Sequence, residues 1–134
     1  MTKTCVAKTA VLLLCSAASA QTPPTECFDK AVTQVEYAAC LKTEMEALSK
    51  QYKNVEEQVM SRMRALDRVQ KNKKATQALT DASKAFQMYV KEECELIEKS
   101  YGSGAGAGAA GLACRINLTR LRMGALQHQF LSAQ

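Results

Sequence analysis

The chain has 134 residues, with 18 basic and 13 acidic side chains, one histidine and no tryptophan. Its formal charge of +5 is modest, and the chain lacks the dense basic patch that nucleic-acid binding requires. The single histidine and the absence of any Cys-x-x-Cys unit, nucleophile motif or phosphate-binding glycine loop argue against a metal site, a cofactor and an enzyme.

The first twenty residues have the pattern of a secretory signal. Two lysines precede a short apolar run, and Ala18-Ser19-Ala20 forms an A-x-A cleavage motif. We therefore predict cleavage after Ala20, one domain over residues 21–134, and a periplasmic or secreted location. The loss of two lysines leaves 16 basic and 13 acidic side chains, or +3. The apolar run is too short to span a bilayer and no later stretch is apolar enough, so we expect no membrane span.

Four cysteines follow the signal, and they are Cys27, Cys40, Cys94 and Cys114. An even number of cysteines in an exported chain indicates disulfides rather than free thiols. Zinc is the competing interpretation, which spacings of 13 and 20 residues do not favour. Three pairings are open, and the helices described below favour the sequential one.

Residues 34–70 predict one long helix. Thr33 and Glu36 have the S/T-x-x-E spacing of a capping box at its start. Apolar residues then recur at alternating steps of four and three, as on one face of a helix. They are Leu41, Met45, Leu48, Tyr52, Val55 and Val59, with Leu66 and Val69 returning to the same register. Arg62 occupies a position where the stripe should continue, with Met63 beside it, so the stripe slips there.

A break before Thr33 matters for the first cysteine pair. One straight helix over thirteen residues would hold Cys27 and Cys40 about 20 Å apart, beyond the reach of a disulfide. A short leading helix, from Cys27 to Val32, that folds back at the break makes a Cys27–Cys40 bridge possible.

The second half of the chain predicts two more helices. Residues 71–74 form a polar turn, whose lysines we interpret as a solvated helix end rather than a patch for an anionic partner. A second apolar stripe runs over residues 75–99, and residues 112–131 return to helix. Between them, the Gly/Ala-rich segment 101–111 predicts a flexible loop. A Cys94–Cys114 bridge would tie the two helices together.

These patterns predict an all-α fold. We expect an elongated antiparallel hairpin or bundle of three main helices, preceded by a short N-terminal helix and held by two disulfides.

Several residues together resemble a known family, the LprI-type lysozyme inhibitors. They are the four cysteines, Glu36, Leu48, Tyr52, Phe86, Tyr89, Tyr101-Gly102-Ser103, Thr119 and Arg122. The most specific string is C-x4-T-x2-R at Cys114-Thr119-Arg122, and the likeness extends from Cys27 to about Leu126. The chain departs from the family where Phe86 replaces the usual Trp and Val90-Lys91 the common Arg-Asp. The resemblance implies a small helical protein of the bacterial cell envelope, with lysozyme inhibition attributed to the family's namesake.

We therefore predict a non-enzymatic envelope protein that binds a protein partner, with a lysozyme or a related muramidase as the target. The predicted partner-binding residues are Tyr101, Gly102, Ser103, Gly104, Thr119 and Arg122. The first four lie in the segment that a Cys94–Cys114 bridge would hold at both ends, as in inhibitor loops. An overall charge of +3 provides no long-range attraction to the strongly basic animal lysozymes.

Alternative interpretations remain open for these side chains and for the function. Arg122 can instead reach a carboxylate or a helix end on a neighbouring helix, with Thr119 packed nearby. Tyr52, Phe86 and Tyr89 are interpreted as seam residues rather than as a binding box. The alternative function is a structural or assembly protein, whose long seam pairs with another envelope protein or with a second copy of the chain in a homo-oligomer.

Overall fold

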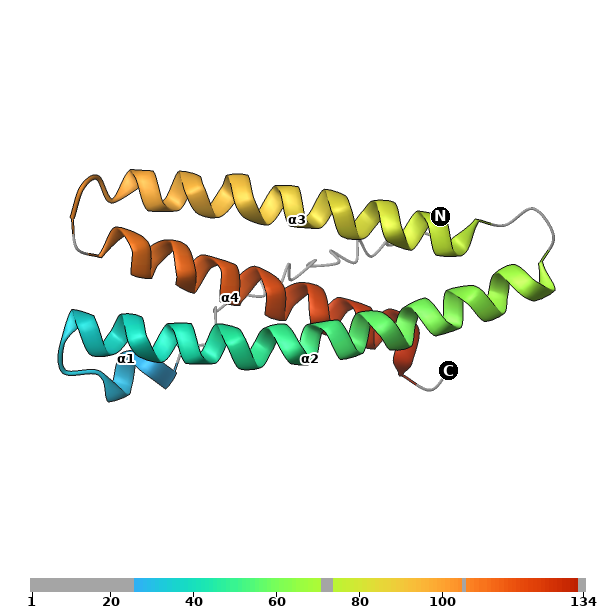
Figure 1. Cartoon of the computed structure of the whole chain (residues 1–134), viewed down its shortest axis with the longest axis horizontal. Coiled ribbons are helices and arrows are strands. Elements are labelled where there is room, and N and C mark those ends of the chain that lie inside the picture. The colour runs from blue at the N-terminus through green and yellow to red at the C-terminus, as the bar shows by residue number, and fades with distance from the viewer. Residues whose placement is uncertain (1–25, 71–73, 105, 133–134) are drawn as a thin grey trace, which may run out of the picture.

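The computed structural model describes residues 26–70, 74–104 and 106–132, which form an elongated bundle of helices (Figure 1). The helices are α1 (Glu26–Lys30), α2 (Gln34–Val69), α3 (Ala75–Ser100), α4 (Ala107–Leu126) and a π-helical turn, η1 (Gln127–Leu131), that continues α4. Within those ranges there is no strand, and the all-α prediction is confirmed. The predicted signal, residues 1–20, lies outside the described ranges.

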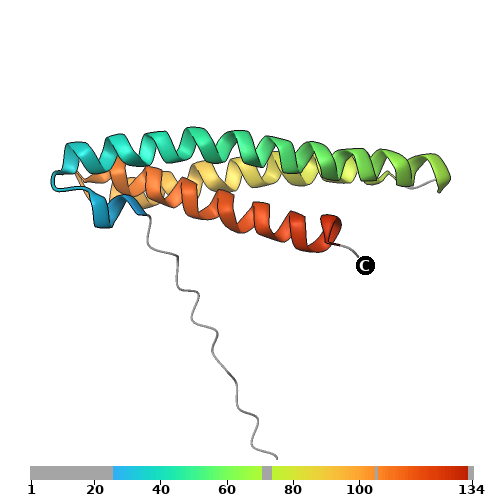
Figure 2. The same cartoon turned by 90° about the horizontal axis from the view of Figure 1, so that it is seen from below.

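Three long helices run antiparallel in succession, and α4 lies between α2 and α3 (Figure 1). With 36 residues, α2 is about 54 Å long. It continues together with α3 beyond the end of α4. At the opposite end, the short α1 folds back beside the start of α2 (Figure 2). Both predicted disulfides are present, Cys27–Cys40 between α1 and α2 and Cys94–Cys114 between α3 and α4.

The predicted capping box starts α2. Thr33 Oγ1 accepts a hydrogen bond from the Glu36 N–H at 3.2 Å, and Glu36 Oε2 accepts from the Thr33 N–H at 3.0 Å. The Val32 N–H also donates to Glu36 Oε2. These backbone donors hold the pKa of Glu36 below its usual value. The break that they fix allows α1 to turn back and Cys27 to reach Cys40.

Two clusters of buried side chains form the core. One contains Cys27, Leu41, Leu48, Ala109 and Ile116, and the other contains Val55, Val59, Met63, Leu79 and Leu126. The predicted stripe of α2 is therefore correct as far as Val59. The expected slip at Arg62 agrees with the burial of Met63, but the predicted return of the stripe at Leu66 and Val69 was wrong, because these side chains are 39% and 76% exposed. The reason is that α4 has ended there, so no third helix covers this part of α2.

The start of α3 is capped by a residue that the sequence pattern did not reveal. Most of the predicted polar turn, residues 71–73, lies outside the described ranges. Asp67 Oδ1 accepts from the Ala75 N–H at 2.8 Å, and Oδ2 accepts from the Thr76 N–H at 3.0 Å and hydroxyl at 2.6 Å. Asp67 thus caps α3 from the preceding helix, while the local N-cap, Lys74, makes no side-chain cap. The donors of Thr76 and Ala75 lower the pKa of Asp67.

The prediction of a flexible loop over residues 101–111 was wrong in its second half. Helix α4 begins at Ala107, five residues before the expected start. Its first turns are stabilised by tertiary contacts, since Ala109 and Gly111 are buried, and by the Cys94–Cys114 bridge. Packing outweighs the cost of about 1 kcal/mol for each helical glycine. The connection between α3 and α4 is therefore a short turn.

Two halves of the molecule can be distinguished. We call the half that contains both disulfides the stapled half, comprising residues 26–51, 88–104 and 106–121. The other half, with the α2–α3 turn at its tip, is the open half, comprising residues 52–70, 74–87 and 122–132.

Candidate functional site

A groove of about 530 Å³ crosses the stapled half. One wall comes from α1 and the start of α2, the other from the end of α3, and α4 forms its floor because it lies between them (Figure 1). We call it the aromatic groove. Its lining residues include Phe28, Tyr37, Tyr89, Glu93, Ile97, Tyr101, Ala110, Ala113, Asn117, Leu118 and Leu121.

Aromatic side chains are concentrated in this groove. The chain has only seven aromatic residues, and four of them line it. Phe28, Tyr89 and Tyr101 are 71%, 52% and 62% exposed. Phe28 packs edge-on against Tyr37, with ring centroids 6.2 Å apart. Aromatic side chains are enriched at protein interfaces and among the residues that dominate binding energy, so this groove is a candidate for partner binding.

The Gly/Ala-rich sequence explains why the groove is hollow. Ala110 and Ala113 are the floor residues in the first turns of α4, and their methyl groups do not fill the space between α1 and α3. Gly111 lies on the side of α4 that faces α3, where an added Cβ would be 2.8 Å from Glu98 Oε2. The second half of the segment that the pattern predicted as a flexible loop is thus helix, and it approaches α3 closely.

The turn after α3 borders one end of the groove. Gly102 has a φ of +66°, a conformation that other residues rarely adopt, and its N–H donates to the Lys99 carbonyl at 3.1 Å. This geometry ends α3 and leaves Tyr101 on the groove. Tyr101, Gly102, Ser103 and Gly104 are all exposed at the tip of the stapled half.

Thr119 and Arg122 lie elsewhere. Fifteen residues of helix separate Ala107 from Arg122, or about 22 Å, so the structure does not bring this pair to the turn. Thr119 is buried, and the Arg122 guanidinium lies 5.7 Å from the centroid of the Phe86 ring. The arginine that reaches a carboxylate on α2 is Arg120, which pairs with Glu44.

Tyr52 belongs to the same interior group. Its ring lies 6.1 Å from that of Phe86, and its hydroxyl donates to Glu56 Oε1 at 3.3 Å. Burial raises the pKa of Tyr52 and the Glu56 carboxylate adds to the effect, while Arg122 partly opposes it. Tyr52 and Phe86 are therefore seam residues, as expected, whereas Tyr89 is on the groove.

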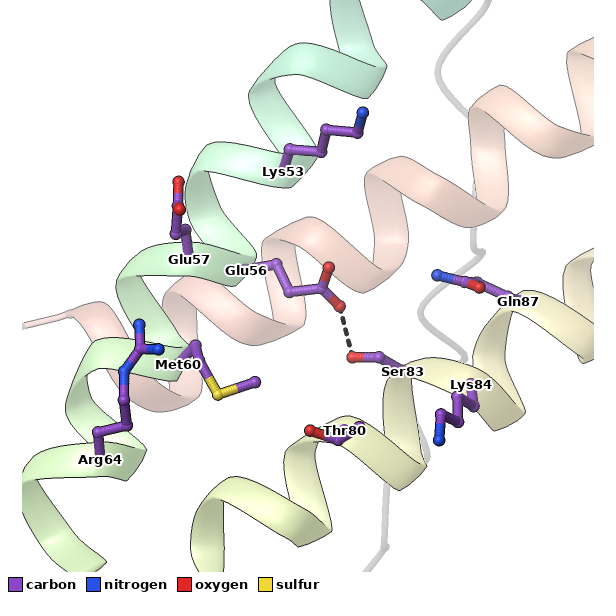
Figure 3. A pocket seen from close by; sticks show the side chains of 9 residues that line it. All are labelled: Lys53, Glu56, Glu57, Met60, Arg64, Thr80, Ser83, Lys84 and Gln87. Carbon is purple, nitrogen blue, oxygen red and sulfur yellow. Dashed lines mark hydrogen bonds between the residues drawn. The ribbon is translucent and has the colours of Figure 1, made fainter.

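A second hollow, of about 620 Å³, lies between α2 and α3 in the open half (Figure 3). Glu56 and Ser83 point toward each other across it and are hydrogen-bonded. The charged side chains of Lys53, Glu57 and Arg64 point away from that pair in Figure 3. Because its charged groups diverge, this hollow offers no convergent set of ligands, and the aromatic groove is the better candidate.

Charge is distributed unevenly between the two halves. The stapled half has nine acidic and seven basic side chains, or −2, whereas the described open half has four acidic and seven basic ones, or +3. The mild overall charge therefore conceals an acidic end and a basic end. Sequence reasoning missed this, since residues from both ends alternate along the chain.

A comparison with known protein families identifies the family to which this chain belongs. The family described as Lysozyme inhibitor LprI matches residues 27–126, which include the four cysteines, the groove and most of the bundle. The chain belongs to the LprI lysozyme inhibitor family. The match begins at Cys27 and ends at Leu126, the bounds that the sequence resemblance suggested. Neither a curated protein nor a solved structure matches this LprI-family chain.

Among the described residues, no cluster of three or more His, Cys, Asp or Glu side chains could hold a metal ion. No described helix is long and apolar enough to cross a membrane.

Proposed function

We propose that this protein is a non-enzymatic binding protein of the cell envelope that inhibits a lysozyme or a related muramidase. The observation that carries the proposal is the family match over residues 27–126, whose description names a lysozyme inhibitor. An inhibitor acts by occupying its target, and therefore needs an interaction surface rather than catalytic groups.

The stapled half is the end that we assign to the target. It has the exposed aromatic rings that dominate the energetics of many protein interfaces, and its net charge is −2. A strongly basic lysozyme would be attracted to this half and repelled by the open half, which would orient the encounter. The acidic charge of the stapled half therefore supports attraction to a basic target, which the overall charge of +3 by itself does not.

The α3–α4 turn contributes to this surface. Its described residues are 101–104 and 106, and it connects two helices that the Cys94–Cys114 bridge joins. A short clamped turn loses less conformational entropy on binding than a floppy loop of eleven residues would. We assign direct contact to Tyr101, Gly102, Ser103 and Gly104, and a positioning role, through the packing of α4, to Thr119 and Arg122.

Lysozyme-activity titration of the oxidised protein tests the proposal, against animal-type and bacteriophage-type enzymes. A Tyr101→Ala, Ser103→Ala variant should inhibit less than the wild type. A Val69→Ala variant changes an equally exposed side chain at the far tip and should inhibit as the wild type does. No inhibition of any lysozyme at micromolar protein would refute the proposal. Equal inhibition by all variants would move the interface away from the turn.

An extracytoplasmic location is part of the proposal. Two disulfides support it, because disulfides persist mainly in oxidising compartments. The predicted signal over residues 1–20 adds to this support. N-terminal sequencing of exported protein should begin at Gln21, and retention in the cytoplasm would contradict the assignment.

The assembly alternative rests on one observation. Leu66 and Val69 continue the α2 stripe but lack a covering helix. If this surface pairs with another envelope protein or a second copy, Val69→Lys should disrupt the complex. A molar mass that stays monomeric across a wide concentration range would exclude the homo-oligomer.

A further inference from the structure

We propose that the aromatic groove binds a cationic side chain, an arginine or lysine, that projects from the basic partner. The inference rests on the proposed function for the identity of the partner and deepens it by naming the chemistry that is recognised. It comes from three kinds of group that line the groove: aromatic rings, a carboxylate and an amide oxygen.

The rings supply the first attraction. Tyr89 lies in the second half of α3 and Tyr101 directly follows its last residue, whereas Phe28 and Tyr37 come from the opposite wall. A guanidinium or ammonium group over such rings is attracted by their negative faces, and a long aliphatic stem can lie along them. The chain itself uses this contact in its interior, where Arg122 lies over Phe86.

A carboxylate supplies the second attraction. Glu93 lines the groove and, within the described ranges, takes part in no ion pair. The basic side chains Lys99 and Arg115 already form ion pairs with other acidic side chains. Lys99 pairs with Glu95 at 2.7 Å, and Arg115 with Glu98 at 3.5 Å. Glu93 is thus the groove carboxylate left for a cation from outside the chain.

The amide oxygen is the third group. Asn117 Oδ1 is buried beside the groove and accepts no hydrogen bond from the described residues. Buried polar atoms without a partner are uncommon and costly. A guanidinium has five N–H donors and an ammonium three, so a cation that pairs with Glu93 keeps donors for the Asn117 amide, whose oxygen it would reach once that side chain rotates toward the groove.

Other occupants fit the groove less well. An apolar ligand would leave Glu93 and Asn117 without partners, and an anion would meet a half of charge −2. The stapled half of a second copy would be repelled for the same reason. A basic protein satisfies the rings, the carboxylate and the surrounding charge together.

The first experiment detects the cation without a lysozyme. We would follow the tyrosine ring signals by NMR while adding acetyl-Gly-Arg-Gly-amide, with the norleucine and glutamate analogues as controls. The arginine peptide should shift the signals of Tyr89 and Tyr101, and the analogues should not. Equal shifts with all three peptides, or none with arginine, would overturn the proposal.

Variants define the site. Tyr89→Ala and Glu93→Gln should each weaken binding of the arginine peptide about three- to tenfold, whereas Tyr89→Phe keeps the ring and should bind as the wild type does. Met88→Ala is the matched control, because Met88 is the exposed neighbour of Tyr89 on α3 but does not line the groove. If Met88→Ala weakens binding as much as Tyr89→Ala, the groove is not the site.

A lysozyme-inhibition assay of the same variants separates this inference from the proposed function. If the wild type inhibits a lysozyme and Glu93→Gln and Tyr89→Ala inhibit equally well, the groove assignment fails while the function stands. If the arginine peptide binds in the groove but no lysozyme is inhibited, the function fails while the site stands. Loss of both peptide binding and inhibition in the groove variants, with Met88→Ala unaffected, supports both.

Discussion

The stapled half and the open half are held together by different means. In the stapled half, two disulfides join the helices, and α4 contributes small residues such as Ala109 and Gly111. In the open half, large side chains such as Met63 and Leu126 fill the core, and Asp67 caps α3. Both halves contain a hollow, of about 530 Å³ in the stapled half and about 620 Å³ in the open half. The difference lies in the lining, because exposed aromatic rings border the hollow of the stapled half, whereas charged and polar side chains border that of the open half. The surface suited to binding therefore lies in the stapled half.

Removing a disulfide should produce the largest effect and test this contrast directly. Replacing Cys94 and Cys114 together by Ser should lower the free energy of unfolding by about 3 kcal/mol, because the bridge closes a 20-residue separation in the unfolded chain. Urea denaturation measures the loss. Hydrogen exchange should show faster opening of the first turns of α4, with little change around Val59. Uniform acceleration throughout the bundle would contradict the division into two halves.

Substitution of two glycines of α4, one at a time, should separate the effect of packing on stability from that of helix propensity. Gly108→Ala meets no atom within 4 Å and should stabilise the protein by about 0.5–1 kcal/mol, since alanine favours helix. Gly111→Ala gains the same propensity but would press against Glu98, so a net loss of about 1 kcal/mol is expected. Thermal unfolding measures both. Equal stabilisation by the two changes would show that α4 does not approach α3 closely.

The start of α2 provides a smaller effect in the stapled half. Thr33→Ala removes the side chain that accepts the Glu36 N–H and should cost about 1 kcal/mol. Thr43→Ala is the matched control, because Thr43 is exposed within α2 and, among the described residues, its hydroxyl bonds only to the Ala39 carbonyl. Its urea midpoint should not fall, since alanine favours helix at this position. A similar loss in both variants would mean that the capping box does not stabilise the break.

The smallest predicted effect is the pH dependence of stability that Asp67 causes at the tip of the open half. The folded pKa of Asp67 is below its ordinary value of 3.8, so the unfolded chain binds a proton at a higher pH than the folded one does. The stabilisation is complete well above pH 3.8 and is lost as pH falls through the folded pKa. Asp67→Asn should therefore lower stability at neutral pH and flatten its decline in acid.

A control identifies the origin of that pH dependence. Asp81 accepts a hydrogen bond only from the Gln77 side chain among the described residues, so Asp81→Asn should leave the acid limb of the stability curve close to that of the wild type. The curves come from urea unfolding at a series of pH values. An Asp67→Asn curve that parallels the wild type would rule out the cap as its source.

Much of the fold could be predicted from local patterns. The capping box of Thr33 and Glu36 set the start of α2, because its two hydrogen bonds join residues only three apart. The periodic stripe set the buried face of α2 as far as Val59. The break between α1 and α2 made the Cys27–Cys40 pairing possible. These features depend on neighbours in the chain, and their physical cause is visible in the sequence.

The candidate site could be predicted only in part. Tyr101–Gly104 were expected in a loop between two helices and are found in an exposed turn between α3 and α4, and Tyr101 borders the groove. The groove itself was not foreseen, because its lining comes from residues as far apart in the chain as Phe28 and Leu121. A clue was present in the Gly/Ala segment, whose alternation is compatible with either a loop or a tightly packed helix.

By itself, the amino-acid sequence determined the all-α class, the helix periodicity and the start of α2, since these follow from side-chain spacing and capping over a few residues. Only the tertiary structure decided whether residues 107–111 are helix, where Asp67 finds its donors, which part of the α2 stripe is covered, and how charge separates between the two halves. Each of these depends on which helices lie side by side and where α4 ends. Contacts between distant segments provide the free energy that overrides local propensity, and that free energy exists only when the bundle has assembled.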